Sequence, residues 1–476
     1  MQGVVSTVMD RLYVNIPGKL VSEERYVVDT IFSDFLGVEY ELLSSESDGF
    51  VLSLSGNPVK SIRVENVFFS VLQNSWLKTE VLPKLPLDRW NVKEDLPEVM
   101  LCEDSVPVIY GKKLTNGSYF QQTDRNITIG LDIFGSIFFM LTRYEECVNR
   151  QCDQHERYPA TESIAFKEGF LMRPIVNEYV EILWTAMKRL WPGIERKKRN
   201  YRVIPTHDVD LPTMGYKRPW GLILKSALGD IVKRKSLKLS LRRLLAKAGA
   251  YKLDPGYSFD FIMDMSEEFG LTSEFYFMTD HSHPKYDTFY NFEDEHVTKI
   301  LRAIHERGHI IGLHASYNSY SDPKRIKREF QKLISGMEKL GIRQDKVGSR
   351  QHFLRFRVPV TWRILDQAGV DYDTTLSFAQ HVGFRAGTCY EYQVYDLEQR
   401  KPLKIRERPL IAMDGSLLDR KYMGLDFEKA AEYVQVLAKR VRMFSGDLVL
   451  LWHNTRLTTH EERQLYNIII EMGLSV

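Results

Sequence analysis

The chain has 476 residues, 43% of them hydrophobic and 27% charged, with a formal net charge of +2 at pH 7. This length exceeds one ordinary compact core, and the balanced composition excludes long disorder and gives no reason to expect nucleic acid as a partner. The four cysteines show no C-x-x-C spacing, so we expect reduced thiols. The start lacks a basic stretch followed by an apolar one, and no segment has the roughly eighteen apolar residues of a membrane span, which predicts a cytoplasmic protein.

The first 195 residues predict a smaller mixed α+β domain. Apolar residues recur at helical spacing in three ranges, 25–37, 132–148 and 174–191. Short β-rich runs lie between them, at 38–43 and 66–72. The charged run 193–200 indicates a linker, which gives domains at 1–195 and 201–476. The spacing of residues in the first domain indicates no chemistry, so its function stays unknown.

After Tyr201, short apolar runs alternate with helical patterns. The runs are 202–206, 274–278, 309–313, 346–350 and 448–452. Strand and helix repeated in this way predict parallel β-structure, either an α/β barrel or an open doubly wound sheet. In both architectures, functional groups gather at the C-terminal ends of the strands.

Titratable groups follow four of these five predicted strands. They are Asp208 and Asp210, His314, His352 and His453. One such residue alone is more often a helix cap or a packed histidine, but their occurrence at four strand ends favours a shared site. Asp208 and Asp210 would project to one face of an extended strand, so one can bind a metal while the other handles protons. If a helix begins directly after its strand, His314 and Asn318 share a helical face and can reach one ion.

The order of these motifs resembles that of the polysaccharide deacetylases, a carbohydrate esterase family. The corresponding segments are T-H-D-V-D at 206–210, His314 to Asn318, R-Q-H at 350–352 and L-W-H at 451–453. The resemblance implies a distorted (β/α) barrel at 201–476. The whole chain also resembles a bacterial subgroup that has an N-terminal domain of unknown function and genes beside those of surface-polysaccharide synthesis, on segments such as DIFGSIFFMLTRYEE, SRQHFLRF, GFRAGTCYEY and LLWHN.

The resemblance implies a metal-dependent hydrolase that removes N-acetyl groups from a sugar or a surface-polysaccharide precursor. Asp208 is then the base and His453 the acid, and Arg350 orients Asp208. Arg385 is expected to act like Arg350. The resemblance further implies that the ligands of a divalent metal ion, with zinc as the expected metal, are Asp210, His314 and Asn318.

Three departures from the family pattern leave alternatives open. Asn318 stands where the family has a second histidine, so the ion could be weakly held, exchanged or absent. Val209 splits the acidic pair, so the roles of base and ligand could be swapped. His352 stands where the family commonly has a proline. It is either a substrate contact or a further metal ligand, and Tyr317 is also expected to contact the substrate. The competing hypothesis is a non-catalytic glycan-binding or scaffold protein with a degenerate metal site, and a third hypothesis has the site cleave another amide or an O-acetyl ester.

A basic segment at 213–255 interrupts the second domain just after its first motif. Residues 217–252 contain eleven Lys or Arg residues and one acid, Asp230. Two series spaced i, i+4, i+7, i+8 predict two amphipathic helices, the first with Leu224, Leu228, Ile231 and Val232 and the second with Leu237, Leu241, Leu244 and Leu245. The helices either pack on the barrel with solvated charges or lie on an anionic membrane, which would suit a lipid-linked or acidic glycan and a place at the inner membrane face. The segment has no series of stacking aromatics, which disfavours nucleic acid.

Overall fold

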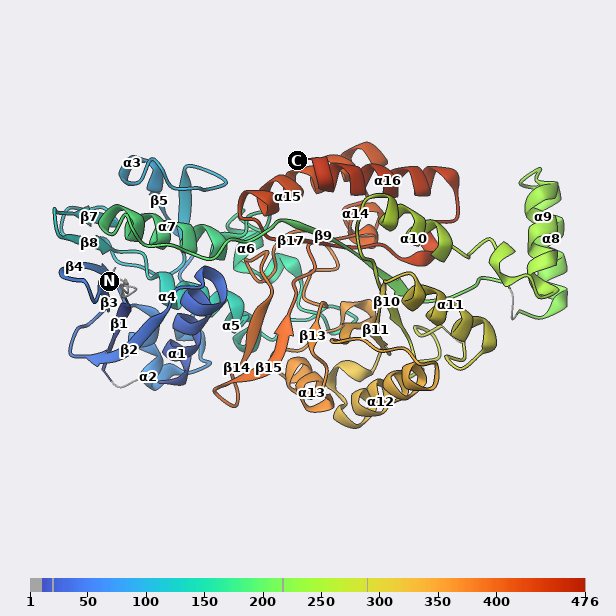
Figure 1. Cartoon of the computed structure of the whole chain (residues 1–476), viewed down its shortest axis with the longest axis horizontal. Coiled ribbons are helices and arrows are strands. Elements are labelled where there is room, and N and C mark those ends of the chain that lie inside the picture. The colour runs from blue at the N-terminus through green and yellow to red at the C-terminus, as the bar shows by residue number, and fades with distance from the viewer. Residues whose placement is uncertain (1–10, 19–20, 216–217, 289, 476) are drawn as a thin grey trace, which may run out of the picture. The chain divides into compact units, whose positions relative to one another are not determined.

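The computed structural model describes residues 11–18, 21–215, 218–288 and 290–475, without the side chains of 72–74 (Figure 1). The chain divides into two compact units. Unit 1 comprises Met1–Gln151, Thr161–Asn200 and Ala386–Leu403, and unit 2 comprises Cys152–Ala160, Tyr201–Arg385 and Lys404–Val476. Each unit therefore takes one short segment from the other half of the sequence.

Unit 1 is a mixed α/β unit built on a sheet with the order β2-β1-β3-β4-β8-β7, which contains parallel and antiparallel pairs. The strands are β1 (Leu12–Pro17), β2 (Tyr40–Ser45), β3 (Phe50–Leu54), β4 (Asn57–Val64), β7 (Phe120–Gln122), β8 (Asn126–Ile129), a separate pair β5 (Asp88–Asn91) and β6 (Ser105–Val108), and β14 (Tyr392–Asp396). The helical segments up to residue 190 are α1 (Ser22–Asp29), η1 (Thr30–Leu36), α2 (Phe68–Ser75), η2 (Thr79–Val81), α3 (Val92–Asp95), α4 (Ile133–Leu141), α5 (Tyr144–Val148), η3 (Ala160–Glu162), α6 (Ile164–Lys167) and α7 (Ile175–Leu190).

Helix α4 forms the centre of the core of unit 1. All nine of its residues are buried, and Phe134 stacks on Phe50 with ring centroids 4.2 Å apart. Asp132 caps the helix by accepting the N–H of Gly135. Burial raises the pKa of this carboxyl to about 6, although its hydrogen bonds with backbone N–H groups oppose the shift.

The helices expected at 25–37, 132–148 and 174–191 are confirmed, the second with a break at Arg143 between α4 and α5. The β-rich run expected at 66–72 is wrong, because this range enters helix α2. Asp132 accepts the N–H groups of Val67 and Phe68 at the start of α2. Phe68 and Phe69 both pack on Phe138. Long-range capping and aromatic packing thus override the local β preference.

Unit 2 is a mixed α/β unit around a curled half-barrel sheet. Its strands follow the order β15-β13-β12-β11-β10-β9-β17-β16, and each neighbouring pair is parallel. The bounds are β9 (Arg202–Val209), β10 (Glu274–Phe277), β11 (Ile310–Ala315), β12 (Gly348–Gln351), β13 (Tyr372–Asp373), β15 (Lys401–Glu407), β16 (Ala412–Met413) and β17 (Asp447–Leu451). All five strands expected from the sequence are therefore confirmed, and the sheet is open rather than a closed ring.

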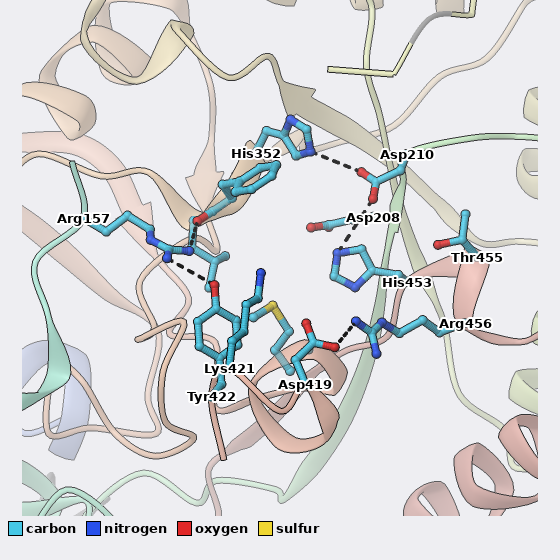
Figure 2. Close-up of a pocket in the computed structure, with 14 residues that line it drawn as sticks. Arg157, Asp208, Asp210, His352, Asp419, Lys421, Tyr422, His453, Thr455 and Arg456 are labelled. Atoms are coloured by element: carbon cyan, nitrogen blue, oxygen red, sulfur yellow. Dashed lines mark hydrogen bonds and ion pairs between the residues drawn. The ribbon is translucent and has the colours of Figure 1, made fainter. Parts of the chain in front are cut away.

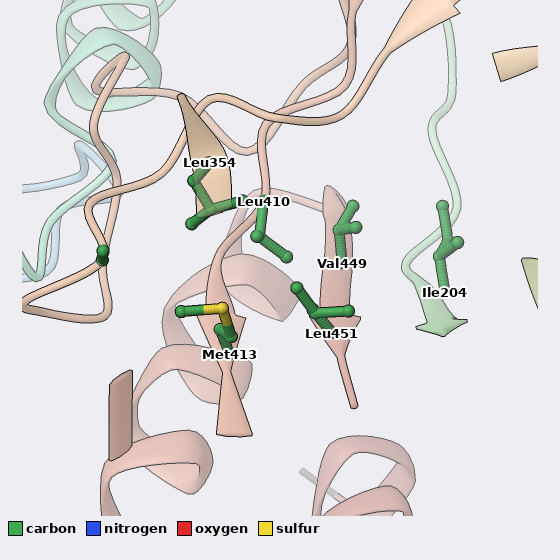
Figure 3. Packing of buried hydrophobic residues seen from close by; sticks show 7 residues of the cluster. Ile204, Leu354, Leu410, Met413, Val449 and Leu451 are labelled. Atoms are coloured by element: carbon green, nitrogen blue, oxygen red, sulfur yellow. The ribbon is translucent and has the colours of Figure 1, made fainter. Parts of the chain in front are cut away.

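Helices follow most of these strands along the chain, but none follows β13 or β15 before the next strand. They are α10 (Phe259–Glu268), α11 (Glu295–Glu306), α12 (Pro323–Lys339), α13 (Val360–Ala368), α14 (Asp414–Leu418), α15 (Phe427–Met443) and α16 (His460–Ser475), with short turns η4 (Tyr251–Leu253), η5 (Ser319–Ser321), η6 (His352–Leu354) and η7 (Asn454–Arg456). Strands β10, β12 and β17 are buried at every position, as expected for parallel strands with both faces covered. One cluster of the core joins strands and loops near the site (Figure 3), and it contains Ile204, Leu354, Ala379, Leu410, Met413, Val449 and Leu451.

The basic segment forms the two helices expected from its periodicity, α8 (Trp220–Val232) and α9 (Leu237–Lys247), which lie side by side (Figure 1). Of the expected segment 217–252, Lys217 lies outside the described residues. Across the described part of the chain, no helix combines the length and the apolar character that crossing a bilayer requires.

Candidate active site

Four parallel strands bring their C-terminal residues to the same edge of the sheet in unit 2. Asp208 lies near the end of β9, His314 lies in β11, and His352 follows β12 directly. His453 comes two residues after β17. Figure 2 shows Asp208, Asp210, His352 and His453 directed toward one space. The convergence expected from the strand ends is thus present.

Asp210, His314 and His352 form a compact cluster in which one potential ligand atom from each lies within 4.8 Å of the others. Nε2 of His314 is 3.5 Å and Nε2 of His352 is 3.6 Å from Oδ1 of Asp210. These separations exceed ordinary hydrogen bonds. Among the described residues, no hydrogen-bond partner reaches Oδ1 of Asp208, Oδ1 of Asp210 or Nε2 of His314, although all three atoms are buried. Such an arrangement of unsatisfied acceptors suits a bound cation.

Each histidine at the site is anchored through Nδ1. Nδ1 of His314 lies 3.1 Å from the carbonyl oxygen of Arg350, and Nδ1 of His352 lies 2.9 Å from Oδ1 of Asp287. An acceptor at Nδ1 favours the proton there and leaves the Nε2 lone pair facing the aspartates. Metal-binding imidazoles are held in the same way, by a carbonyl or a carboxylate behind the ring.

His453 is held more strongly than the other two histidines. Its Nδ1 lies 2.7 Å from Asp414 Oδ1, and its backbone N–H donates to Asp414 Oδ2. Burial disfavours the imidazolium, but the negative charges of Asp414, Asp210 and Asp208 outweigh burial and raise the pKa of His453 to about 10. A protonated imidazole with Nε2 4.0 Å from Asp210 Oδ2 can supply a proton to a leaving group.

Arg350 places a buried positive charge beside Asp208. Its Nη1 is 3.7 Å from Asp208 Oδ1, while Nη2 donates to Thr206 Oγ1 at 2.9 Å and to Thr374 Oγ1 at 3.1 Å. The two threonines fix the guanidinium, so the charge next to Asp208 is preorganised. The orienting role expected for Arg350 stays a prediction.

Arg385 is buried next to Ser377 and Phe378. Its Nη1 donates to the carbonyl of Ser377, and its guanidinium lies over the ring of Phe378. Arg385 is a described residue and does not line the pocket around Asp208. The role expected for Arg385 stays a prediction.

Asn318 does not share a helical face with His314. His314 lies within strand β11, and Asn318 precedes the short turn η5, so no helix begins where the sequence interpretation required one. The Asn318 amide donates to the Ser282 carbonyl at 3.0 Å and accepts from Arg355 Nη1 at 3.1 Å. The expected helical geometry is wrong, and His352 is the third member of the cluster.

Tyr317 is 6% exposed and packs in an aromatic group beside the site. The ring centroid of Tyr317 is 4.5 Å from that of Tyr286 and 4.0 Å from the Arg355 guanidinium. Its hydroxyl is 2.9 Å from Nδ1 of His155. These contacts bury the side chain within an aromatic wall.

The sequence alone predicts a substrate contact at Tyr317, and that role stays a prediction.

The residues around Asp208 and Asp210 enclose a pocket of about 240 Å³ (Figure 2). Its wall carries Arg157, which is bound to Asp153, and Arg456, which pairs with Asp419 at 2.5 Å. The other lining residues are His352, Phe353, Leu354, Met413, Gly415, Lys421, Tyr422, His453 and Thr455. A wall that mixes charged, hydroxyl and aromatic groups suits a polar ligand with several hydroxyls.

Sequence reasoning missed two carboxylates that hold the histidines. Asp414 directly follows strand β16, so the rule of strand ends that found Asp208 would also have found it. Asp287 lies in a loop between β10 and α11 and contacts His352 across 65 positions of sequence. No local pattern marks such a residue, because its role depends on a contact formed only in the folded chain.

Comparison with family models and with curated proteins assigns no activity to the chain. A family of unknown function, DUF7033, matches residues 12–192. No curated protein matches the sequence.

Among solved structures, a protein from Mycobacterium smegmatis named as a polysaccharide deacetylase is 17% identical, with a TM-score of 0.37, over 58% of this chain and 85% of that one. Puue allantoinase is 13% identical, with a TM-score of 0.35, over 60% of this chain and 87% of its own. The carbohydrate deacetylase Agd3 is 9% identical, with a TM-score of 0.35, over 97% of this chain and 84% of its own. With TM-scores below 0.5, these likenesses assign no function, and the case for one rests on the geometry of the site.

Proposed function

We propose that the protein is a metal-dependent hydrolase that removes the N-acetyl group from a sugar. The observation that carries this proposal is the cluster of Asp210, His314 and His352, with Asp208 3.8 Å from His314 and His453 4.0 Å from Asp210. Two imidazoles and a carboxylate are a donor set that suits zinc, and the buried acceptors without partners fit such an ion. Within the proposal, His352 is the third ligand in place of Asn318, which the family resemblance implied.

A divalent ion at this position would polarise an amide carbonyl and lower the pKa of water. Asp208, held beside the Arg350 guanidinium, would accept a proton from that water. Asp414 keeps His453 charged, so that His453 can donate a proton to the nitrogen of the breaking C–N bond. Water is thereby added across the amide, and the products are acetate and a free amino sugar.

The pocket and the motif order support a sugar as the substrate class. A volume of about 240 Å³ accommodates a small group such as one sugar with its acetamide, and the hydroxyl-bearing and charged wall offers partners to its oxygens. Zinc as the metal, a surface-polysaccharide precursor as the substrate and a cytoplasmic address belong to the same proposal.

The direct test is release of acetate from N-acetylated sugars and their oligomers by the purified full chain. We expect release that a chelator abolishes and a divalent metal restores. Asp208→Asn is expected to lower the rate by roughly 100-fold or more, as for loss of a general base, whereas the matched control Asp280→Asn changes a carboxylate outside the pocket and leaves it unchanged.

Metal binding without acetate release from any N-acetylated sugar would contradict the proposed reaction. Binding of the sugar without turnover would then favour a glycan-binding protein, and release of acetate only from O-acetylated sugars would favour an esterase.

A further inference from the structure

The paired helices α8 and α9, residues 220–247, carry their large apolar side chains on the outside. The buried positions of the two helices hold Ile223, small residues and Asp230, since Ala227, Ser240 and Ala246 are the other buried residues. A water-facing helical pair would show the reverse arrangement, with leucines in the seam and polar residues outside.

The exposed apolar residues form a stripe on each helix. On α8, Trp220, Leu224, Leu228 and Ile231 recur at i, i+4, i+8 and i+11, and they are between 41% and 61% exposed. On α9, the stripe contains Leu237, Leu241 and Leu245, with exposures of 72%, 58% and 42%. Residues at these spacings share one side of a helix. The pair therefore offers apolar surface that the described chain leaves uncovered.

Buried charge fixes the two helices to each other. Asp230 on α8 is fully buried and accepts from Arg243 on α9 with an ion-pair distance of 2.7 Å, and it also pairs with Arg234. This acid is the only one in residues 218–252, which contain ten Lys or Arg residues. The pairing thus consumes two cations and leaves the rest of the surface strongly positive, with Lys225, Lys233, Lys235 and Lys238 exposed.

We propose that the α8–α9 pair is a docking surface for an anionic lipid bilayer. Exposed leucines and a tryptophan can enter the boundary between headgroups and acyl chains while the flanking lysines meet anionic headgroups. Charge complementarity favours lipid over a second copy of this chain, because contact between two copies of the α8–α9 surface would bring positive charges together. The helices follow strand β9 in the chain, so docking would hold unit 2 at the membrane surface.

The test measures binding of the full chain to vesicles by co-sedimentation. We expect binding to an equimolar mixture of phosphatidylcholine and phosphatidylglycerol, little binding to phosphatidylcholine alone, and weaker binding in high salt. The charge variant Lys233→Glu, Lys235→Glu, Lys238→Glu is expected to lower the partition coefficient by roughly 100-fold, at about five-fold for each basic charge removed. The apolar variant Leu228→Ser, Leu237→Ser, Leu241→Ser is expected to lower it by at least about ten-fold.

The matched control changes exposed residues on another helix of unit 2, α15, with Tyr433→Ser, Val436→Ser and Lys439→Glu. It removes two apolar groups and one basic group away from the α8–α9 pair, and we expect unchanged binding. All substituted side chains are exposed, so circular dichroism should report an intact fold in each variant. Absence of binding to the anionic vesicles, or an equal loss in the control, would overturn the proposal. Self-association of the lipid-free chain that the apolar variant abolishes would also overturn it, in favour of a second copy.

Discussion

Three imidazoles at the candidate site are held by three different acceptors, and the acceptor decides what each ring can do. The carbonyl of Arg350 orients the ring of His314 so that Nε2 faces Asp210, whereas the carboxylate of Asp414 holds His453 as a cation. The strand-end residues were predictable from the sequence because a strand fixes where its last side chain goes. Among the partners behind the rings, Asp414 follows β16 and the rule of strand ends would have found it, whereas Asp287 lies in a loop that no local pattern marks.

The role of Asp414 can be tested by Asp414→Asn. Loss of this negative charge should lower the pKa of His453 from about 10, since burial then opposes the imidazolium with less compensation. NMR titration of the His453 ring in the metal-free protein measures the shift, and acetate release should fall by roughly 100-fold. Asp280→Asn is the control. An unchanged His453 titration would show that Asp414 does not maintain the charge.

Glu24 in helix α1 gives a prediction of pH-dependent stability. Burial raises its pKa to about 7, above the ordinary value, so the folded state binds this proton more tightly than the unfolded state does. The free energy of unfolding should therefore decrease as the pH rises from about 4.5 to about 7, and the penalty is complete above that range. Glu24→Gln removes the charge and should stabilise unit 1 by about 1–3 kcal/mol at pH 8, with little gain at pH 4.5.

Urea unfolding at both pH values measures this effect. The control Glu39→Gln alters an exposed carboxylate and should change stability by less than about 0.5 kcal/mol. Equal effects of Glu24→Gln at pH 4.5 and pH 8 would refute the assigned pKa.

At the scale of elements, periodicity predicted helices and parallel strands well. The strands of unit 2 are buried on both faces and appear in the sequence as short apolar runs, and helix α7 covers the range expected for it. Helix α2 was missed because its start depends on Asp132, more than 60 positions later. The environment of Asn318 was missed for a related reason, since the chain leaves β11 without starting a helix.

Asp132 should be essential for two elements of unit 1 at once. It caps α4 and accepts the first N–H groups of α2. Asp132→Ala is therefore expected to lower the free energy of unfolding of unit 1 by about 2–4 kcal/mol, more than one helix cap contributes. Urea unfolding followed by circular dichroism measures the change. A loss below about 0.5 kcal/mol would mean that aromatic packing alone holds α2.

At the scale of the whole molecule, a bound ion would link the stability of unit 2 to its chemistry. Four strands and the turn after β12 supply the charged groups of the site, so an ion held by Asp210, His314 and His352 would join segments far apart in the sequence. At a metal concentration of 100 times Kd, the gain is about 2.7 kcal/mol. A chelator should thus lower the thermal transition of unit 2 in the wild type but not in Asp210→Ala. An equal transition temperature of the wild type with and without chelator would argue against a link between ion binding and the stability of unit 2.

The most direct test of the account is the metal content of the purified chain, compared among the wild type, His352→Ala and Asn318→Ala. The account predicts one divalent ion per chain in the wild type, a large loss in His352→Ala because a ligand is removed, and retention in Asn318→Ala because its amide contacts Ser282 and Arg355. Loss of the ion in Asn318→Ala with retention in His352→Ala would contradict the assigned ligands, and absence of any ion in the wild type under all divalent conditions would contradict the metal-dependent mechanism itself.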